Sequence, residues 1–167
     1  MLLYPNHHFK NVTEINMNFL EGNRLKGIIL DMDNTLIDFN RNLLDGVKQW
    51  CQDLKKNNIK LYIVSNSNKK DKLEQVSNAL EIPYASFSMK PFKKGFKKAM
   101  EEMNLKNENI AVVGDQIFTD ILGANRCKMF SILVDPIAEK DIILTRIKRP
   151  IERYIMKQYS KHKGAEK

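Results

Sequence analysis

The sequence is poor in the residues and patterns that mark several classes of protein. Only two of its 167 residues are cysteines, and Cys51 and Cys127 match neither the spacing of metal ligands nor a disulfide framework. No Gly/Ser-rich or single-residue tract occurs, and charges of both signs are mixed along most of the chain, which argues against extended disorder. These absences favour one folded domain in a reducing compartment.

Long apolar runs are missing as well. No window approaches the roughly 18 apolar residues expected of a membrane-spanning helix, and residues 1–20 lack the pattern of a secretory signal. We therefore expect a cytoplasmic protein whose contact with a membrane, if it makes one, is peripheral on the inner face. The net charge of +8 favours anionic partners such as nucleic acid, phospholipid headgroups or phosphorylated small molecules, without choosing among them.

Four short apolar runs predict the buried strands of a parallel sheet. They cover residues 26–31, 59–65, 110–115 and 129–134. Segments with helical periodicity lie between them, at residues 42–56, 68–80, 93–103 and 119–127. Strands that alternate with helices of this length predict a three-layer α/β fold with a central parallel sheet.

We expect a single domain with three parts. Residues 1–25 should form an N-terminal extension packed on the core, residues 26–148 the core itself, and residues 149–167 a basic C-terminal helix and tail. Pro150 is well placed to start that helix. Its apolar face, which suits either packing on the domain or shallow burial in an anionic membrane surface, contains Ile151, Tyr154, Ile155 and Tyr159.

Polar residues end three of the expected strands. These are Asp31, Ser65 and Asp115. Because ligands of open α/β sheets bind beyond the carboxyl ends of the strands, the three side chains should converge on one site.

The motif DMDNT brings two carboxylates, Asp31 and Asp33, to the end of the first expected strand. One carboxylate can attack phosphorus while the other protonates the departing oxygen, which divides a hard hydrolysis into two displacements through an aspartyl phosphate. An Asp/Asn-rich turn remains the alternative for this motif on its own.

Two further segments offer groups that bind phosphate. Ser65 and Asn66 follow an apolar strand, where a hydroxyl and backbone amides can hold a phosphoryl oxygen, although a helix N-cap explains Ser65 equally well. Lys90, before Pro91, can neutralise a transferring phosphoryl group, or it can be an ordinary solvated lysine.

A second acidic motif, GDQIFTD, supplies Asp115 and Asp120. Together with Asp31 and Asp33, these acids predict an oxygen-rich pocket suited to Mg²⁺. The cation would offset repulsion among the acids and stabilise charge on a bound phosphate.

In this order, DMDNT, VSNS, the lysine of a Lys-Pro pair and GDQIFTD resemble the four motifs of the haloacid dehalogenase (HAD) superfamily, over residues 26–135. The resemblance implies a HAD-like Rossmannoid fold and a phosphatase, because dehalogenase members lack an acid at the position of Asp33. It also implies a role for each site residue: Asp31 as nucleophile, Asp33 as general acid/base, Ser65, Asn66 and Lys90 as phosphate-binding groups, Asp31, Asp33 and Asp115 as metal ligands, and Thr35 and Asp120 as supporting residues.

Nearly the whole chain also resembles the YqeG-type branch of HAD subfamily IIIA. The segments that carry this resemblance are LYP near the start, GIILDMDNTL, GDQIFTDILGANR and ILVDPI with the basic tail that follows. That branch is related to the mitochondrial phosphatidylglycerophosphate phosphatase, which implies phosphatidylglycerophosphate, an anionic lipid at the membrane surface, as substrate.

The intervals between the motifs leave no room for a cap domain, so the site should be open to bulky substrates. Two rival hypotheses remain at this point. One keeps the HAD phosphatase and changes the substrate to a soluble, nucleic-acid or protein phosphoester, although we expect no specific nucleic-acid partner. The other is a non-catalytic phosphate-binding module, against which the complete set of Asp31, Asp33, Lys90 and Asp115 argues.

Overall fold

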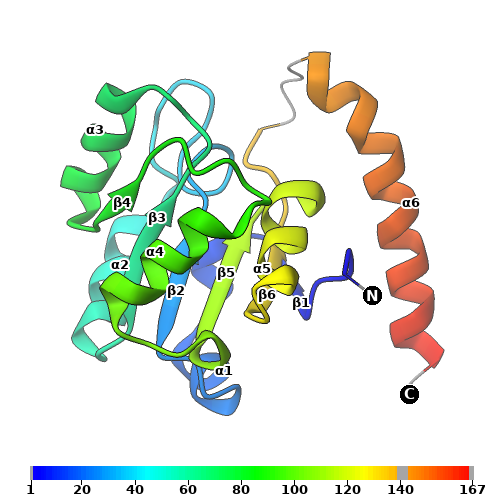
Figure 1. Ribbon diagram of the computed structural model, residues 1–167, viewed down its shortest axis with the longest axis horizontal. Coiled ribbons are helices and arrows are strands. Elements are labelled where there is room, and N and C mark those ends of the chain that lie inside the picture. Colours follow the sequence, from blue (N-terminus) through cyan, green and yellow to red (C-terminus); the bar gives the residue numbers. More distant parts are fainter. Residues whose placement is uncertain (1, 139–142, 166–167) are drawn as a thin grey trace.

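A sheet of six parallel strands forms the centre of the protein in the computed structural model, which describes residues 2–138 and 143–165. The strands follow the order β1-β6-β5-β2-β3-β4 across the sheet (Figure 1). Their bounds are β1 His7–Phe9, β2 Gly27–Leu30, β3 Lys60–Val64, β4 Tyr84–Ala85, β5 Ile110–Gly114 and β6 Phe130–Val134. All five pairings are parallel, as expected for strands joined by crossover connections.

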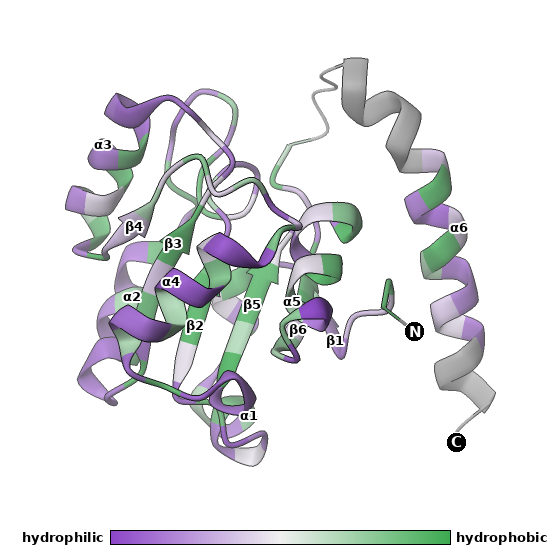
Figure 2. Cartoon of the chain, viewed as in Figure 1, coloured by the Kyte–Doolittle hydropathy of each residue, from purple (hydrophilic) through white to green (hydrophobic). Residues whose placement is uncertain are grey.

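Helices cover both faces of this sheet. On one face lie η1 (Val12–Glu14), α1 (Met17–Gly22), α2 (Val47–Lys56) and α3 (Lys70–Leu80); on the other lie α4 (Lys93–Met103) and α5 (Leu122–Arg126). Successive strand residues serve the two faces in turn, so that Ile28 and Leu30 pack with the first group of helices and Ile29 with the second. The central strands β2 and β5 are therefore buried along their whole length, and Figure 2 shows β5 green along most of its length.

The predicted three-layer α/β fold with a central parallel sheet is confirmed. Each of the four expected strands is present, and so is each of the four helices expected between them, with bounds that shift by a few residues. The segment from Asp33 to Lys90 is fully described and holds only loops, α2, β3, α3 and β4. No cap domain is inserted there, as predicted.

Several short elements escaped prediction, among them the edge strands β1 and β4 and the N-terminal helix α1. The edge strands β1 and β4 contain three and two residues, too few to produce an apolar pattern. The expected helix over 42–56 begins only at Val47, since the preceding residues form a loop in which Leu44 N–H donates to Leu36 O and Gly46 adopts a left-handed φ of 80°. The turn η3 (Ile117–Ile121) is a π-helix that runs directly into α5.

The N-terminal segment packs against the core. Strand β1 adds to the edge of the sheet beside β6, and Asn6 exchanges side-chain hydrogen bonds with Ser131. Across the domain, the Trp50 indole N–H of α2 donates to Ile15 O at 2.8 Å.

The C-terminal helix α6 (Ile143–Ala165) differs from expectation at its start. It begins before Pro150 and carries that proline inside the helix, so the prediction that Pro150 starts it is wrong. Proline has no backbone N–H, so Pro150 costs the helix one backbone hydrogen bond. No described helix is both long and apolar enough to cross a membrane.

Only part of the expected apolar face of α6 is covered. Ile155 is buried in a cluster with Ile117, Ile121 and Leu133. Tyr159 is also buried, and its ring lies against that of Tyr4 with the centroids 5.8 Å apart. Glu152 adds a polar contact, since its carboxylate accepts the Ile117 N–H at 3.2 Å. The remaining two residues of that face, Ile151 and Tyr154, are 52% and 63% exposed.

Candidate active site

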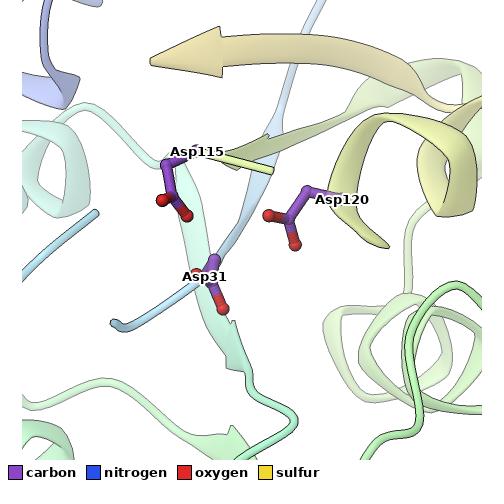
Figure 3. Close-up of side chains that lie close together, drawn as sticks. All are labelled: Asp31, Asp115 and Asp120. Carbon is purple, nitrogen blue, oxygen red and sulfur yellow. The ribbon is translucent and has the colours of Figure 1, made fainter. Parts of the chain in front are cut away.

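Three carboxylates meet at the carboxyl edge of the sheet. Asp31 follows β2 and Asp115 follows β5, and these strands are neighbours in register, so the two acids leave the sheet side by side. Asp120 reaches the same point from η3. Figure 3 shows the three side chains close together, and one oxygen from each lies within 4.8 Å of the others.

Glycine at position 114 makes room for this arrangement. A Cβ atom at Gly114 would lie 2.3 Å from the carboxylate of Asp120, closer than atoms can approach. The glycine therefore lets Asp120 lie against the end of β5, where its Oδ2 accepts the Gln116 N–H at 3.2 Å.

Lys90 binds two of these acids at once. Its Nζ donates to Asp31 Oδ1 at 2.6 Å and to Asp120 Oδ1 at 2.7 Å, and its side chain is only 3% exposed. Burial lowers the pKa of Lys90, but the charges of Asp120 and Asp31 outweigh it and hold that pKa above its ordinary value. Lys90 thus remains a cation inside the site.

The acids themselves are costly to ionise in this arrangement. Burial, opposed by Lys90 and reinforced by Asp120, raises the pKa of Asp31 to about 7. Burial and then the charges of Asp31 and Asp120 raise the pKa of Asp115 well above its usual value. A further positive charge would stabilise both carboxylates.

The loop after β3 holds Lys90 in place. Asn66 Oδ1 accepts the Lys90 N–H at 2.6 Å, and Asn66 Nδ2 donates to Lys90 O at 3.1 Å. The buried Ser65 Oγ accepts the Ser67 N–H at 3.0 Å, which leaves its hydroxyl hydrogen to donate elsewhere. The predicted phosphate-binding residues therefore lie close together in the structure. The Asn66 side chain, however, forms its hydrogen bonds with the backbone of Lys90.

Asp33 lies apart from the group of three acids. Its carboxylate pairs with Lys72 of α3, and its side chain is 43% exposed, against 9% for Asp31. No local pattern singles out Lys72 as this partner, because the pair joins residues 39 positions apart and depends on how α3 packs. Only the low exposure of the Lys72 side chain, 13%, distinguishes it from the exposed lysines nearby.

The donor set fits a hard divalent cation. Asp115 Oδ1 and Thr35 Oγ1 are shielded from solvent and have no hydrogen-bond partner within the described part of the chain. Among the residues that the structure describes, the ion pairs of the site's four acids involve two ammonium groups, those of Lys90 and Lys72. Four ionised acids at this edge of the sheet would therefore exceed the two cations paired with them by two charges. A divalent cation bound by carboxylate oxygens of Asp31 and Asp115 would supply that charge and a partner for Asp115 Oδ1.

Comparison with known proteins places this site in a family. A family model described as haloacid dehalogenase-like hydrolase matches residues 39–128, more than half of the chain. The chain belongs to the haloacid dehalogenase-like hydrolase family. The match includes Ser65, Lys90 and Asp115 and begins shortly after the Asp31–Asp33 motif.

Relatives of this HAD chain agree with the assignment. It is 39% identical over 153 residues to the probable phosphatase YqeG of Bacillus subtilis, across 91% of this chain and 88% of that protein. Among solved structures, an uncharacterized protein from Listeria monocytogenes has a TM-score of 0.57 at 20% identity, covering 71% of this chain and 85% of its own. A hypothetical protein from Xanthomonas campestris has a TM-score of 0.51 at 14% identity, covering 78% and 75%. The comparisons confirm the family, the fold and the enzyme class that the four motifs predict.

Proposed function

We propose that this HAD hydrolase cleaves phosphate monoesters with Asp31 as nucleophile and Asp33 as its acid/base partner. The observation that supports this most directly is the position of Asp31, which ends β2 with its carboxylate 2.6 Å from a buried ammonium group. A phosphoryl group brought to Asp31 would meet the positive charge of Lys90 and the free hydroxyl hydrogen of Ser65.

In the proposed first step, an oxygen of Asp31 forms a bond to phosphorus while the bond between phosphorus and the ester oxygen breaks. Asp33, in its protonated form, gives its proton to that departing oxygen, and an aspartyl phosphate remains. The greater exposure of Asp33 suits this task, because the departing group leaves towards solvent.

In the second step, water attacks phosphorus of the aspartyl phosphate and the bond to Asp31 breaks. The Asp33 carboxylate takes a proton from that water, which returns both acids to their starting states and releases inorganic phosphate. The Lys72 ammonium group, which donates to Asp33 Oδ1, would position Asp33 in both steps, through an ion pair while Asp33 is ionised and through a hydrogen bond to its carbonyl oxygen while it is protonated.

We infer that the cation is Mg²⁺, with Asp31 and Asp115 as ligands and Asp120 as the residue that fixes Lys90. When bound, Mg²⁺ would contribute a charge that favours a phosphoryl group at Asp31. Carboxylate oxygens are the ligands that Mg²⁺ prefers, and those of Asp115 include a buried atom with no other partner. The predicted ligand role of Asp33 stays a prediction, because its carboxylate lies outside the group of three.

For the substrate we infer phosphatidylglycerophosphate. The missing cap domain supports a bulky phosphomonoester, the charge of +8 supports an anionic one, and the resemblance to the YqeG-type branch supports this lipid. The B. subtilis relative is a probable phosphatase, which agrees with the reaction class and leaves the substrate open.

Phosphate release from an aryl phosphate tests the reaction. We expect activity with Mg²⁺, none after chelation, and none for Asp31→Asn, which preserves the size of the side chain and removes the nucleophilic carboxylate. Asp53→Asn, an exposed acid of α2, is the matched control and should keep full activity. Equal activity of the wild type and Asp31→Asn would refute the proposed nucleophile.

A substrate panel tests the lipid. Phosphatidylglycerophosphate in mixed micelles is compared with soluble sugar and nucleotide phosphates, each at several concentrations. A higher kcat/KM for the lipid supports the assignment. A higher kcat/KM for a soluble phosphate would refute the lipid and leave the phosphatase reaction in place.

A further inference from the structure

Three large apolar side chains are exposed in the loop that carries Lys90. Phe87, Met89 and Phe92 are 65%, 50% and 59% exposed. They lie within three residues of the lysine whose ammonium group contacts Asp31, and Figure 1 shows this green loop at the edge where the strands end. Single exposed apolar residues are ordinary, but three together beside a catalytic site indicate a surface that something covers.

The backbone conformation of the loop directs these side chains to solvent. Side chains alternate along it: Ser88 and Lys90 are buried, whereas Phe87 and Met89 point to solvent. The exposed pair has left-handed backbone, with φ of 47° and 49°, which is unfavourable for large side chains.

Hydrogen bonds to the loop after β3 fix this conformation. Phe87 N–H donates to Ser67 O at 3.2 Å and Ser88 N–H donates to Ser65 O at 3.0 Å, in addition to the two bonds between Asn66 and Lys90. Ser88 Oγ also donates to Ala85 O at 3.1 Å. The exposed phenyl rings are therefore presented by a tethered loop.

Basic residues follow the apolar ones directly. Helix α4 begins with Lys93 and Lys94, has no acid in its first turn, and continues with Lys97 and Lys98. Cations at a helix N-terminus oppose its dipole, so this arrangement stabilises the helix less than acids would. From Ile82 to Met100 the sequence contains no Asp or Glu, and these four lysines are exposed.

We propose that Phe87, Met89 and Phe92, with Lys93 and Lys94, form a docking surface that inserts into anionic lipid bilayers beside the active site. Apolar tips next to cations match the two layers of such a surface, since the rings enter the acyl boundary and the ammonium groups stay among the headgroups. Single-stranded nucleic acid fits less well, because Met89 offers no ring for a base to stack on. The role of this docking surface rests on the proposed lipid substrate. Its binding to bilayers, however, can be measured without catalysis.

Sedimentation with vesicles tests the proposal. The full chain is mixed with vesicles of phosphatidylcholine alone or of phosphatidylcholine with phosphatidylglycerol, and wild type should bind the second kind. A double variant, Phe87→Asn with Phe92→Ser, should bind at least about tenfold more weakly, the factor expected for losing one buried phenyl ring or more. Asparagine is chosen because it tolerates the left-handed backbone at position 87.

Tyr154→Ser is the matched control, since Tyr154 is 63% exposed and belongs to α6, which Figure 1 shows well apart from the loop between β4 and α4. It should bind vesicles as wild type does. Lys93→Gln with Lys94→Gln, which leaves every apolar contact unchanged, should weaken binding to the anionic vesicles. The Phe variant should keep its thermal unfolding midpoint and its rate on the soluble aryl phosphate, which separates this proposal from the catalytic one.

Several outcomes would overturn the docking surface. One such outcome would be that the wild type fails to bind anionic vesicles, or that it binds single-stranded RNA or a second copy of itself in their place. Another would be that the Phe variant binds vesicles as tightly as wild type. A third would be that Tyr154→Ser loses as much binding as the Phe variant, which would move the membrane contact to α6. Asp31→Asn, inactive under the proposed mechanism, should still bind vesicles, so loss of activity and loss of docking remain distinguishable.

Discussion

The ammonium group of Lys90 donates a hydrogen bond of 2.6 Å to Asp31, the proposed nucleophile. The same group reaches Asp120 at 2.7 Å, so one buried cation serves two buried acids. A buried charge without its partner is far more costly than an exposed one. Stability of the domain and chemistry of the site therefore depend on the same lysine.

Lys90→Met should destabilise the chain in the absence of divalent cations. Removing one partner of a buried ion pair costs roughly 3–5 kcal/mol, because the remaining charge stays buried. Urea unfolding followed by Trp50 fluorescence measures the change. Mg²⁺ should restore part of the lost stability, since a bound cation would offset the negative charge of the acids. The control is Lys97→Met, at an exposed lysine of α4, which should leave the unfolding free energy unchanged. A Lys90→Met chain as stable as wild type in chelator would contradict the structure.

Lys72 is expected to position Asp33 for proton transfer. Lys72→Met should lower kcat by about tenfold to a thousandfold, within the range that general acid/base catalysis contributes, while KM changes little. Lys72→Arg keeps the positive charge and should recover part of the rate. The control is Lys70→Met on the same helix, whose lysine pairs with Glu74 in solvent and should not matter. If kcat of Lys72→Met equals that of wild type, the ion pair has no role in the reaction.

Gly114→Ala should displace Asp120 from Lys90. The added Cβ would meet that carboxylate at 2.3 Å, so the acid must move, and overpacking of this kind costs roughly 1–3 kcal/mol. Thermal unfolding and aryl phosphate hydrolysis should both decline. Gly22→Ala at the end of α1 has nothing within 4 Å of its new Cβ and should match or slightly exceed wild-type stability. Retention of full activity by Gly114→Ala would show that Asp120 need not stay where it is.

The sequence predicted the parts of this fold that local patterns encode. Buried parallel strands require apolar residues on both faces, so β2, β3 and β5 stand out as continuous apolar runs. The acids at their carboxyl ends follow from the geometry of such sheets, which is why Asp31 and Asp115 could be placed together in advance.

Features that depend on tertiary packing could not be predicted in this way. The pair between Lys72 and Asp33 requires α3 to lie over the loop after β2, which no local pattern specifies. The exposed rings of Phe87 and Phe92 lie in a segment without periodicity. Hydrogen bonds from this loop to the loop after β3 hold its backbone, and with it the direction of the side chains. The start of α6 before Pro150 broke the usual rule for proline at helix ends.

Substitution of Asn66 distinguishes two roles for its side chain, phosphate binding and the positioning of Lys90. The sequence predicted a phosphate-binding residue, whereas the structure shows its amide holding the backbone of Lys90 through one accepted and one donated hydrogen bond. Loss of both bonds in Asn66→Ala should cost roughly 1–3 kcal/mol of stability, at about 0.5–1.5 kcal/mol for each. Asn66→Asp keeps the acceptor for the Lys90 N–H but sets a carboxylate oxygen against Lys90 O, so it should recover at most part of this loss.

Thermal unfolding and inhibition by inorganic phosphate together distinguish the two roles of Asn66. If the amide acts by holding Lys90, stability and kcat decline together in Asn66→Ala, because the ammonium group loses its alignment with Asp31. If the amide binds phosphate directly, phosphate inhibition weakens while the unfolding midpoint stays at the wild-type value. Asn68→Ala, the neighbouring exposed asparagine, should change neither quantity. We expect the first pattern, since both polar atoms of the Asn66 amide already have partners on the Lys90 backbone.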